Sequence, residues 1–167
     1  MFNPPFAAPP DYVSALHPLD EREECWFIFS GARLLVSSDQ QRIPNAANIA
    51  LKRSLYMGTF DGRHLFAGEV DHQEQASPGW LWCHLRILYG GISEAYYVLA
   101  GRAMQLLDWD RTHRHCGCCG ELTFIRITER CRECLSCGHL TYPKLAPAIA
   151  VLIQKEEQIL LARGPHS

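Results

Sequence analysis

Six of the eight cysteines of this 167-residue chain are clustered between positions 116 and 138. Two segments stand out there, CGCCG at 116–120 and CLSCG at 134–138, and each is a Cys-x-x-Cys turn followed by glycine. Two thiolates at this spacing can bind one metal ion from a single turn, and two such turns supply the four sulfurs of a closed tetrahedral Zn²⁺ site. The sequence therefore predicts a structural zinc site, with a spacing between the turns close to that of zinc ribbons.

The zinc ligands must be chosen from more thiols than one ion needs. Gly120 and Gly138 each follow the last cysteine of a turn, where the backbone curls around sulfur and often requires a positive φ. A competing pair, Cys131 with Cys134, is followed by leucine instead, and Cys118 should point away from the ion. We therefore expect these ligands: Cys116, Cys119, Cys134 and Cys137. Three nearby histidines are substitute ligands: His113, His115 and His139.

The alternative interpretation of the cluster is that its cysteines are merely buried or disulfide-bonded. Only Cys25 and Cys83 lie outside it, and metal-ligand spacing fits a reducing cytoplasm better than a secreted disulfide framework. We therefore expect a cytoplasmic protein in which this segment unfolds when the zinc is removed, because a structural zinc contributes folding free energy directly.

Charge and hydropathy exclude several classes of function. The net charge is −2 and the pI is about 6.4, which argues against a dominant nucleic-acid surface despite the short basic run at 111–115. No stretch approaches the ~20 apolar residues of a transmembrane helix. No Lys or Arg precedes Arg22, so the charged region of a signal peptide is lacking, and we expect no membrane partner.

The elements that must position the cysteines are mostly strands. Residues 25–30 and 33–37 form one predicted hairpin across Gly31-Ala32. Residues 54–60 and 63–70 form another across Asp61-Gly62, a strong two-residue turn signal. Apolar residues recurring at three and four predict a helix from Glu94 to about Asp108, with Ser93 as its N-cap. Gly101 lies inside this helix, and we expect close packing against the sheet to require it.

The predicted fold class is α+β. We expect a proline-rich, loosely held arm at 1–20, an antiparallel β-rich domain with one main helix at 21–110, and a zinc ribbon at 111–141, where Ile125 and Ile127 alternate as in a strand. Residues 142–167 would be a linker and the first two strands, 148–154 and 158–163, of a truncated domain, since two strands alone are rarely stable.

Four stretches together resemble the NADH pyrophosphatases of the Nudix superfamily. They are LAGRAMQLLDWDRTHRHCGCCG at 99–120, CLSCG at 134–138, YPKLAPAIAVLI at 142–153 and LLAR at 160–163. WFIFSGARLLV and YMGTFDGRHLFAGEV are similar to the N-terminal region of the same family. The resemblance implies a β-rich N-terminal domain, a four-cysteine zinc ribbon and a C-terminal Nudix domain, so the truncated domain at the end of the chain would be Nudix.

The resemblance also implies an activity. Such proteins are homodimers that split the pyrophosphate of NADH or NAD⁺ into a nicotinamide mononucleotide and AMP, and bacterial members also remove NAD caps from RNA. Their zinc is structural, whereas Mg²⁺ or Mn²⁺ carries the chemistry through the carboxylates of the Nudix box.

That box, G-x5-E-x7-R-E-U-x-E-E with U aliphatic, is absent from this sequence. Gly68 to Glu74 fits its first interval, but Trp82 stands where its arginine should be. In the family the box lies C-terminal to a strand like QILLAR, so it would begin beyond Ser167. We therefore expect no catalytic residues in this chain and no hydrolysis by the chain alone.

Three positions match family residues that contact the substrate: Glu129, Tyr142 and Arg86. Each also has a plain structural interpretation, as a solvated carboxylate, a core aromatic and a salt-bridge partner respectively. Two other functions are compatible with the sequence, namely a ribbon that binds RNA or protein without catalysis, and a dimerisation module.

Overall fold

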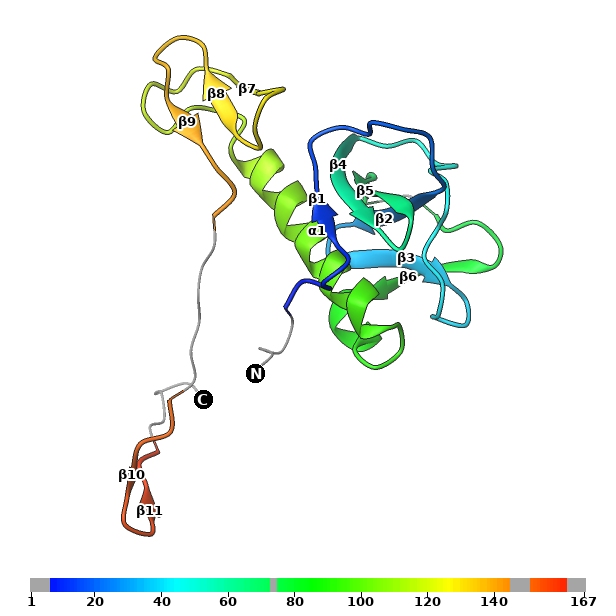
Figure 1. Cartoon of the computed structure of the whole chain (residues 1–167), viewed down its shortest axis with the longest axis vertical. Helices are drawn as coiled ribbons and strands as arrows, with labels where there is room; N and C mark the ends of the chain where they lie inside the picture. Colours follow the sequence, from blue (N-terminus) through cyan, green and yellow to red (C-terminus); the bar gives the residue numbers. More distant parts are fainter. Residues whose placement is uncertain (1–6, 73–74, 145–150, 162–167) are drawn as a thin grey trace.

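The computed structural model describes residues 7–72, 75–144 and 151–161. A six-stranded sheet and one long helix, α1 (Glu94–Thr112), form the larger part, and a small three-stranded sheet lies at the C-terminal end of α1 (Figure 1). The predicted α+β class, with one main helix and a ribbon-like cysteine segment, is confirmed.

The large sheet has the strand order β1-β4-β5-β2-β3-β6. Its strands are β1 (Val13–Ser14), β2 (Glu24–Ser30), β3 (Arg33–Ser37), β4 (Arg53–Phe60), β5 (Arg63–Glu69) and β6 (Trp80–His84). All neighbours are antiparallel except β2 and β5, which run parallel. The mostly antiparallel sheet is therefore confirmed, and one long-range parallel pairing joins its two hairpins into a mixed sheet.

Both predicted hairpins form. Ser30 pairs with Arg33 across Gly31-Ala32, and Phe60 pairs with Arg63 across Asp61-Gly62. Asp61 and Gly62 have φ values of 51° and 71°, the left-handed pair that a type I′ turn requires.

The segment predicted as a loose arm is partly paired. Val13 and Ser14 lie against Thr59 and Gly58 at the edge of β4, and the Tyr12 hydroxyl donates to the Met57 carbonyl at 2.8 Å. The proline content correctly disfavours helix, but it does not prevent two residues from completing the sheet edge.

Apolar residues cover both faces of the central strand β2, which explains its unbroken run of six buried residues. On one face α1 packs against Phe27, Phe29 and their neighbours in the main core. On the other, Trp26 and Ile28 belong to a second core, which side chains from the loop at 47–51 and from β6, among them Trp80 and Trp82, partly cover.

The helix α1 is longer than predicted by one turn and begins where expected. The Ser93 hydroxyl accepts a hydrogen bond from the Tyr96 backbone N–H at 3.4 Å, as an N-cap does. The expected role of Gly101 is wrong: a Cβ built there meets no atom within 4 Å, so no close packing requires glycine.

The small sheet contains β7 (Thr123–Ile125), β8 (Arg132–Cys134) and β9 (Leu140–Thr141), all antiparallel. β7 ends at Ile125, so Ile127 lies beyond the strand and is 85% exposed. The last described elements are β10 (Gln154–Lys155) and β11 (Gln158–Ile159), which pair as a short exposed hairpin. The predicted strands at 148–154 and 158–163 also include positions 148–150 and 162–163, which lie outside the described residues.

Within the described part of the chain, no helix combines the length and the apolar character needed to cross a bilayer.

Candidate zinc centre and ligand-contact cluster

Two turns with matching backbone geometry present the predicted sulfurs. In the first, the Gly120 N–H donates to the Cys116 carbonyl at 2.9 Å, and in the second the Gly138 N–H donates to the Cys134 carbonyl at 2.8 Å. Gly120 and Gly138 have φ values of 81° and 73°, so the positive φ expected at both glycines is present.

The four sulfurs of Cys116, Cys119, Cys134 and Cys137 lie within 4.8 Å of one another. Across the two turns, Cys116 Sγ lies 3.6 Å from Cys137 Sγ, and Cys119 Sγ lies 3.4 Å from Cys134 Sγ. Zn–S bonds of about 2.3 Å place the sulfurs of a tetrahedral site about 3.8 Å apart. The cluster therefore fits a Zn²⁺ ion, and its thiols are free, which excludes disulfides among them.

Backbone N–H groups and neighbouring thiols shift the pKa values of these cysteines, and at Cys137 they shift it in opposite directions. The N–H groups of Cys119 and Cys118 lower the pKa of the Cys116 thiol to about 6. The His139 N–H lowers the pKa of Cys137, but the thiols of Cys119 and Cys116 outweigh it and raise that pKa to about 12. Four crowded thiolates repel one another, so a bound dication is what would let all four ionise together.

The competing ligands lie outside this group. Cys131 is fully buried in the ribbon, Cys118 is exposed, and none of the three nearby histidines joins the four sulfurs in the described structure. The choice of Cys134 with Cys137, made from the glycine that follows each turn, therefore agrees with the geometry.

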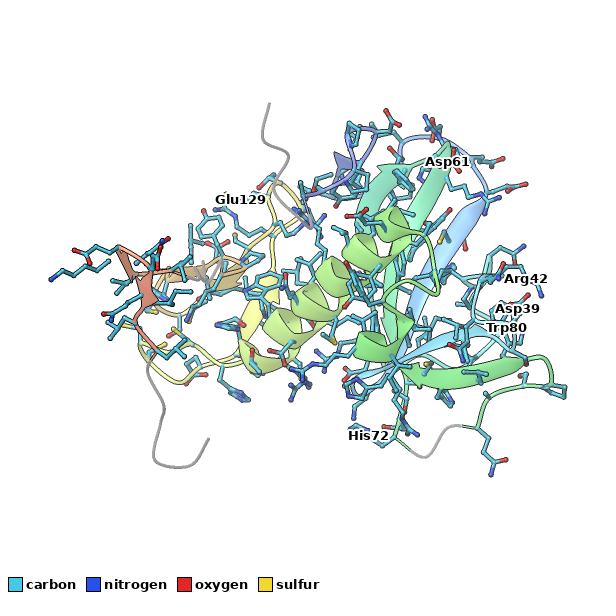
Figure 2. The ribbon with its side chains drawn as sticks, turned by 90° about the horizontal axis from the view of Figure 1, so that it is seen from below. Asp39, Arg42, Asp61, His72, Trp80 and Glu129 are labelled. Atoms are coloured by element: carbon cyan, nitrogen blue, oxygen red, sulfur yellow. The ribbon has the colours of Figure 1, made fainter. Side chains whose placement is uncertain are left out.

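Glu129 and Tyr142 lie against each other. Glu129 belongs to the bend between β7 and β8, and Tyr142 follows β9. The Tyr142 hydroxyl donates to Glu129 Oε2 at 2.9 Å, and Arg126 Nη1 donates to Glu129 Oε1 at 2.9 Å. Figure 2 shows Glu129 at the ribbon end of the molecule, opposite the end that carries Trp80.

The environment of Tyr142 is polar and partly open. The hydrogen bond to Glu129 raises the pKa of the Tyr142 phenol, and Tyr142 lines a shallow hollow of about 390 Å³ beside the zinc turns. His113, His139 and Lys144 line the same hollow, so its described lining has three nitrogen-bearing side chains and no carboxylate.

Arg86 does not join this cluster. It is exposed in a single 3₁₀ turn, η1 (Leu85–Leu88), which directly follows β6 at the far edge of the large sheet. The ribbon contacts the other edge, where Arg130 Nη1 donates to the Tyr56 carbonyl at 2.9 Å and its Nη2 reaches the Ala15 carbonyl. No hydrogen bond or ion pair of the described residues links Arg86 to Glu129 or Tyr142.

Sequence reasoning missed a buried ionic network that fixes the ribbon to the sheet. Asp110, on α1, pairs with Arg132 of β8 through Oδ1 and with Arg53 of β4 through Oδ2, the latter at 2.8 Å. Arg53 Nε also pairs with Glu69 at 2.6 Å, and Arg132 donates to the Thr123 hydroxyl and carbonyl at 2.8 and 2.7 Å. Single charged residues on three separate strands and a helix carry no sequence signal of such pairing, because isolated charges are usually exposed.

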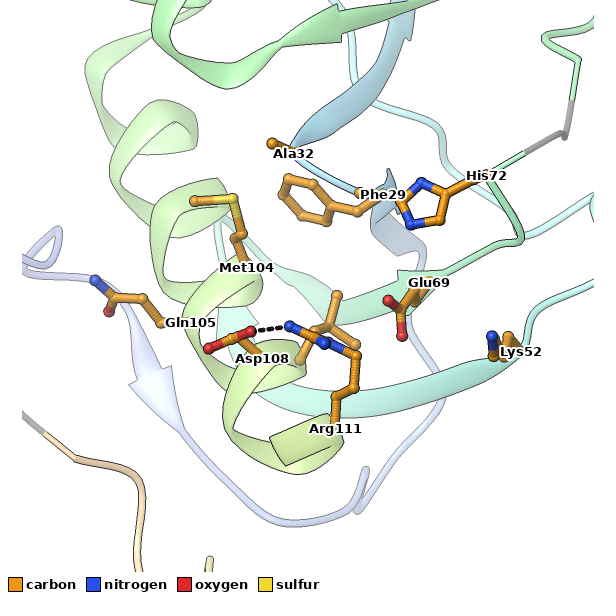
Figure 3. Close-up of a pocket in the computed structure, with 11 residues that line it drawn as sticks. Phe29, Ala32, Lys52, Glu69, His72, Met104, Gln105, Asp108 and Arg111 are labelled. Atoms are coloured by element: carbon orange, nitrogen blue, oxygen red, sulfur yellow. Dashed lines mark hydrogen bonds and ion pairs between the residues drawn. The ribbon is translucent and has the colours of Figure 1, made fainter. Parts of the chain in front are cut away.

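A larger cavity, of about 650 Å³, lies between α1 and the end of the large sheet. Figure 3 shows His72 over Phe29 on one side and the Asp108–Arg111 ion pair on α1 on the other. None of the residues predicted to bind metal or substrate lines it, so it is separate from the zinc turns and the Glu129–Tyr142 pair.

Comparison with known proteins agrees with this architecture. Residues 23–109 match the family described as NADH pyrophosphatase-like rudimentary NUDIX domain. The chain is 32% identical over 149 residues to the NAD-capped RNA hydrolase NudC of Chromobacterium violaceum, covering 89% of this chain and 56% of that protein. It is 33% identical over 166 residues to NudC of Deinococcus radiodurans, covering 97% and 58%.

NudC of Pseudomonas putida KT2440 is 40% identical over 112 residues, covering 66% of this chain and 40% of the relative. The chain thus spans about half the length of the curated relatives that it matches. The family match covers more than half of the chain itself, and it includes β2 to β6 of the large sheet and most of α1. The chain therefore belongs to the family of proteins that carry the NADH pyrophosphatase-like rudimentary NUDIX domain.

Proposed function

We propose that the chain forms the N-terminal and zinc-ribbon part of a Nudix hydrolase that splits the pyrophosphate of NAD(H), including NAD at the 5′ end of RNA. The observation that supports this most directly is that the ribbon segment carries both the Glu129–Tyr142 pair and four sulfurs in tetrahedral-site spacing. The NudC relatives, which are NAD-capped RNA hydrolases, support the same substrate class.

In this proposal Cys116, Cys119, Cys134 and Cys137 hold a structural Zn²⁺. The ion supplies folding free energy by tying the two turns together, and it has no open position for chemistry. The three ribbon strands comprise only eight residues, too few to bury a core of their own, so the segment depends on the metal and on its contacts with α1 and β4.

Glu129 and Tyr142 contact the dinucleotide. A carboxylate that already accepts two hydrogen bonds keeps further lone pairs for hydroxyl or amide donors of a ligand, and the phenol adds an aromatic face. Arg86, at the opposite sheet edge, would reach the same ligand only from another protomer of a homodimer.

The divalent ion that performs hydrolysis, Mg²⁺ or Mn²⁺, would be held by a Nudix box, and this sequence contains none. We propose the domain organisation of an arm at 1–20, the rudimentary domain at 21–110, the ribbon at 111–141 and the start of a catalytic Nudix domain at 142–167. The chain by itself is then a binding and positioning part, without hydrolytic activity.

The test is a titration of the zinc-loaded chain with nicotinamide mononucleotide, in which NMR chemical shifts report the binding. We expect shifts at Glu129 and at the Tyr142 ring, no shift at Asp61 in its distant turn, and loss of binding in Glu129→Gln. AMP release from NADH in the presence of Mg²⁺ or Mn²⁺ is expected to be undetectable. Binding that is unaffected by Glu129→Gln and by Tyr142→Phe would refute the assigned contacts.

A second candidate function, a dimerisation module, is favoured by one observation. Four apolar side chains of the ribbon are about half exposed or more: Leu122, Phe124, Ile125 and Ile127. Apolar residues clustered on a small module are typical of protein interfaces. Sedimentation of the chain and of Phe124→Ser tests this, since a dimer that depends on the ribbon should dissociate in the variant.

A further inference from the structure

The Glu129 carboxylate extends from a segment whose backbone does not by itself determine the direction of the side chain. Residues 127–130 form a bend between β7 and β8, outside the strand ladder. Its backbone is tied locally, since the Cys131 N–H donates to the Glu129 carbonyl at 2.8 Å and the Arg126 N–H donates to the Cys131 carbonyl at 3.0 Å. The direction of the carboxylate is therefore decided by what its two oxygens bind.

Arg126 binds one of those oxygens and is itself anchored elsewhere. Its Nη1 donates to Glu129 Oε1 at 2.9 Å, while its Nε lies 3.2 Å from Glu133 Oε2. Glu133 belongs to β8, where its backbone is paired with Phe124 on one side and Leu140 on the other. Arg126 thus connects the carboxylate in the bend to a position that the sheet holds in place.

We propose that Arg126 is a positioning residue, which bridges Glu133 and Glu129. It thereby fixes the direction of the Glu129 carboxylate, to which Tyr142 is bound, so that the remaining lone pairs of the carboxylate point toward a hydroxyl- or amide-bearing part of the ligand. This inference rests on the proposed function, in which Glu129 and Tyr142 contact a dinucleotide. Only a planar guanidinium can span the two carboxylates with donors in fixed directions, which a lysine ammonium cannot do.

The charge of the cluster indicates which part of a dinucleotide it accepts. Arg126 contributes one positive charge against the two carboxylates of Glu129 and Glu133, leaving a formal charge of −1. Phosphate groups are repelled by such a cluster, whereas ribose hydroxyls, a carboxamide or a cationic nicotinamide ring are not. The phosphates would lie instead toward the hollow lined by His113, His139 and Lys144.

The phenol of Tyr142 provides a readout that separates positioning from simple charge. Its hydrogen bond to Glu129 raises its pKa most, burial and the nearby Cys131 raise it further, and the positive charge of Arg126 lowers it. If Arg126 holds Glu129 against Tyr142, then Arg126→Gln releases the carboxylate and the phenol pKa falls, as in Glu129→Gln. If Glu129 remains hydrogen-bonded to Tyr142 without Arg126, the same variant removes only the positive charge of Arg126, which lowers the phenol pKa, and that pKa therefore rises.

The experiment is a ¹³C NMR titration of the tyrosine Cζ carbons in the zinc-loaded chain, with Tyr142 assigned through Tyr142→Phe. We expect a fall in the pKa of Tyr142 in Arg126→Gln and in Arg126→Lys, and no change in Arg111→Gln, a control that breaks another i,i+3 pair between an arginine and a carboxylate. A rise or no change in Arg126→Gln would overturn the proposal, as would an unaltered pKa in Arg126→Lys or a fall in the control. Zinc content, measured for every variant, shows that the ribbon remains folded.

Binding of nicotinamide mononucleotide separates this inference from the function on which it rests. We expect Arg126→Gln to weaken that binding about tenfold or more, because the Glu129 carboxylate is then no longer directed at the ligand and its charge-assisted hydrogen bond to the ligand is lost. Unaltered binding together with a lower phenol pKa would overturn the role of Arg126 toward the ligand. If the unmodified chain does not bind the mononucleotide while the phenol behaves as expected, Arg126 positions Glu129 and the proposed function is what fails.

Discussion

Replacing Asp110 by alanine should loosen the ribbon from the sheet at a large cost in stability. Asp110 and Arg132 are 7% and 8% exposed, and Asp110 is the one carboxylate that joins both Arg132 and Arg53 in the described network. The four charges of the network, those of Arg53, Arg132, Asp110 and Glu69, sum to zero. Without Asp110, Glu69 still neutralises Arg53, but Arg132 keeps only its two uncharged acceptors on Thr123.

A buried cation left without its partner costs about 3–5 kcal/mol in the free energy of unfolding. Asp108→Ala is the matched control, because Asp108 lies on the same helix and also pairs with an arginine, Arg111, but both side chains are more than half exposed. An exposed i,i+3 pair contributes only about 0.2–0.5 kcal/mol. In Asp110→Ala/Arg132→Met the stranded cation is absent, so we expect much of the lost stability to return.

The assay is urea unfolding of the zinc-loaded chain, monitored by tryptophan fluorescence. Trp109 is adjacent to Asp110 in sequence and reports on this region. Zinc release to a chromophoric chelator in the same solutions shows whether the ribbon opens before the sheet unfolds. Equal destabilisation in Asp110→Ala and Asp108→Ala would refute the reasoning. So would a double variant that is no more stable than Asp110→Ala.

Three further predictions follow from other sites. Gly101→Ala should raise the free energy of unfolding by about 1 kcal/mol, because the added methyl meets no atom and alanine has the higher helix propensity; thermal unfolding checks this. Cys119→Ser should lose the zinc that Cys118→Ser retains, as metal analysis of the purified variants would show, and the reverse pattern would refute the ligand set. Burial raises the pKa of Cys25 from 9.0 to about 12, so the folded state keeps a proton that the unfolded state loses; stability should fall as pH rises from about 9 toward 12, and Cys25→Ala should remove that part of the pH dependence.

The parts of the fold that could be predicted are those whose signal is local. A left-handed turn needs particular residues at particular positions, so Asp61-Gly62 identified its hairpin, and Ser93 identified the start of α1. The ligand choice had the same basis, because a glycine follows each zinc turn and none follows the competing Cys131–Cys134 pair.

What could not be predicted depends on residues far apart in the chain. The parallel pairing of β2 with β5 leaves no periodic signal, because both strands are buried in runs that suit either direction. The network around Asp110 joins positions 53, 69, 110 and 132, each of which looks like an ordinary exposed charge in its own segment. Gly101 was misjudged for a related reason, since sequence alone cannot show what surrounds a helical glycine.

Because α1 leads almost directly into the ribbon, the length of the helix determines where the ribbon lies relative to the sheet. Only three residues separate Thr112, the last of the helix, from Cys116, and the Thr123 hydroxyl donates to the carbonyl of His113 in that short connection. A helix advances about 1.5 Å and rotates about 100° per residue. The 19 residues of α1 therefore set both the distance of the zinc site from the sheet and its rotation about the helix axis. One residue added to or removed from α1 ahead of Asp110 would rotate the ribbon relative to the sheet. Arg130 would leave the carbonyls of Tyr56 and Ala15, Asp110 would leave Arg53, and Glu129 and Tyr142 would point elsewhere, although no ligand of the metal had changed.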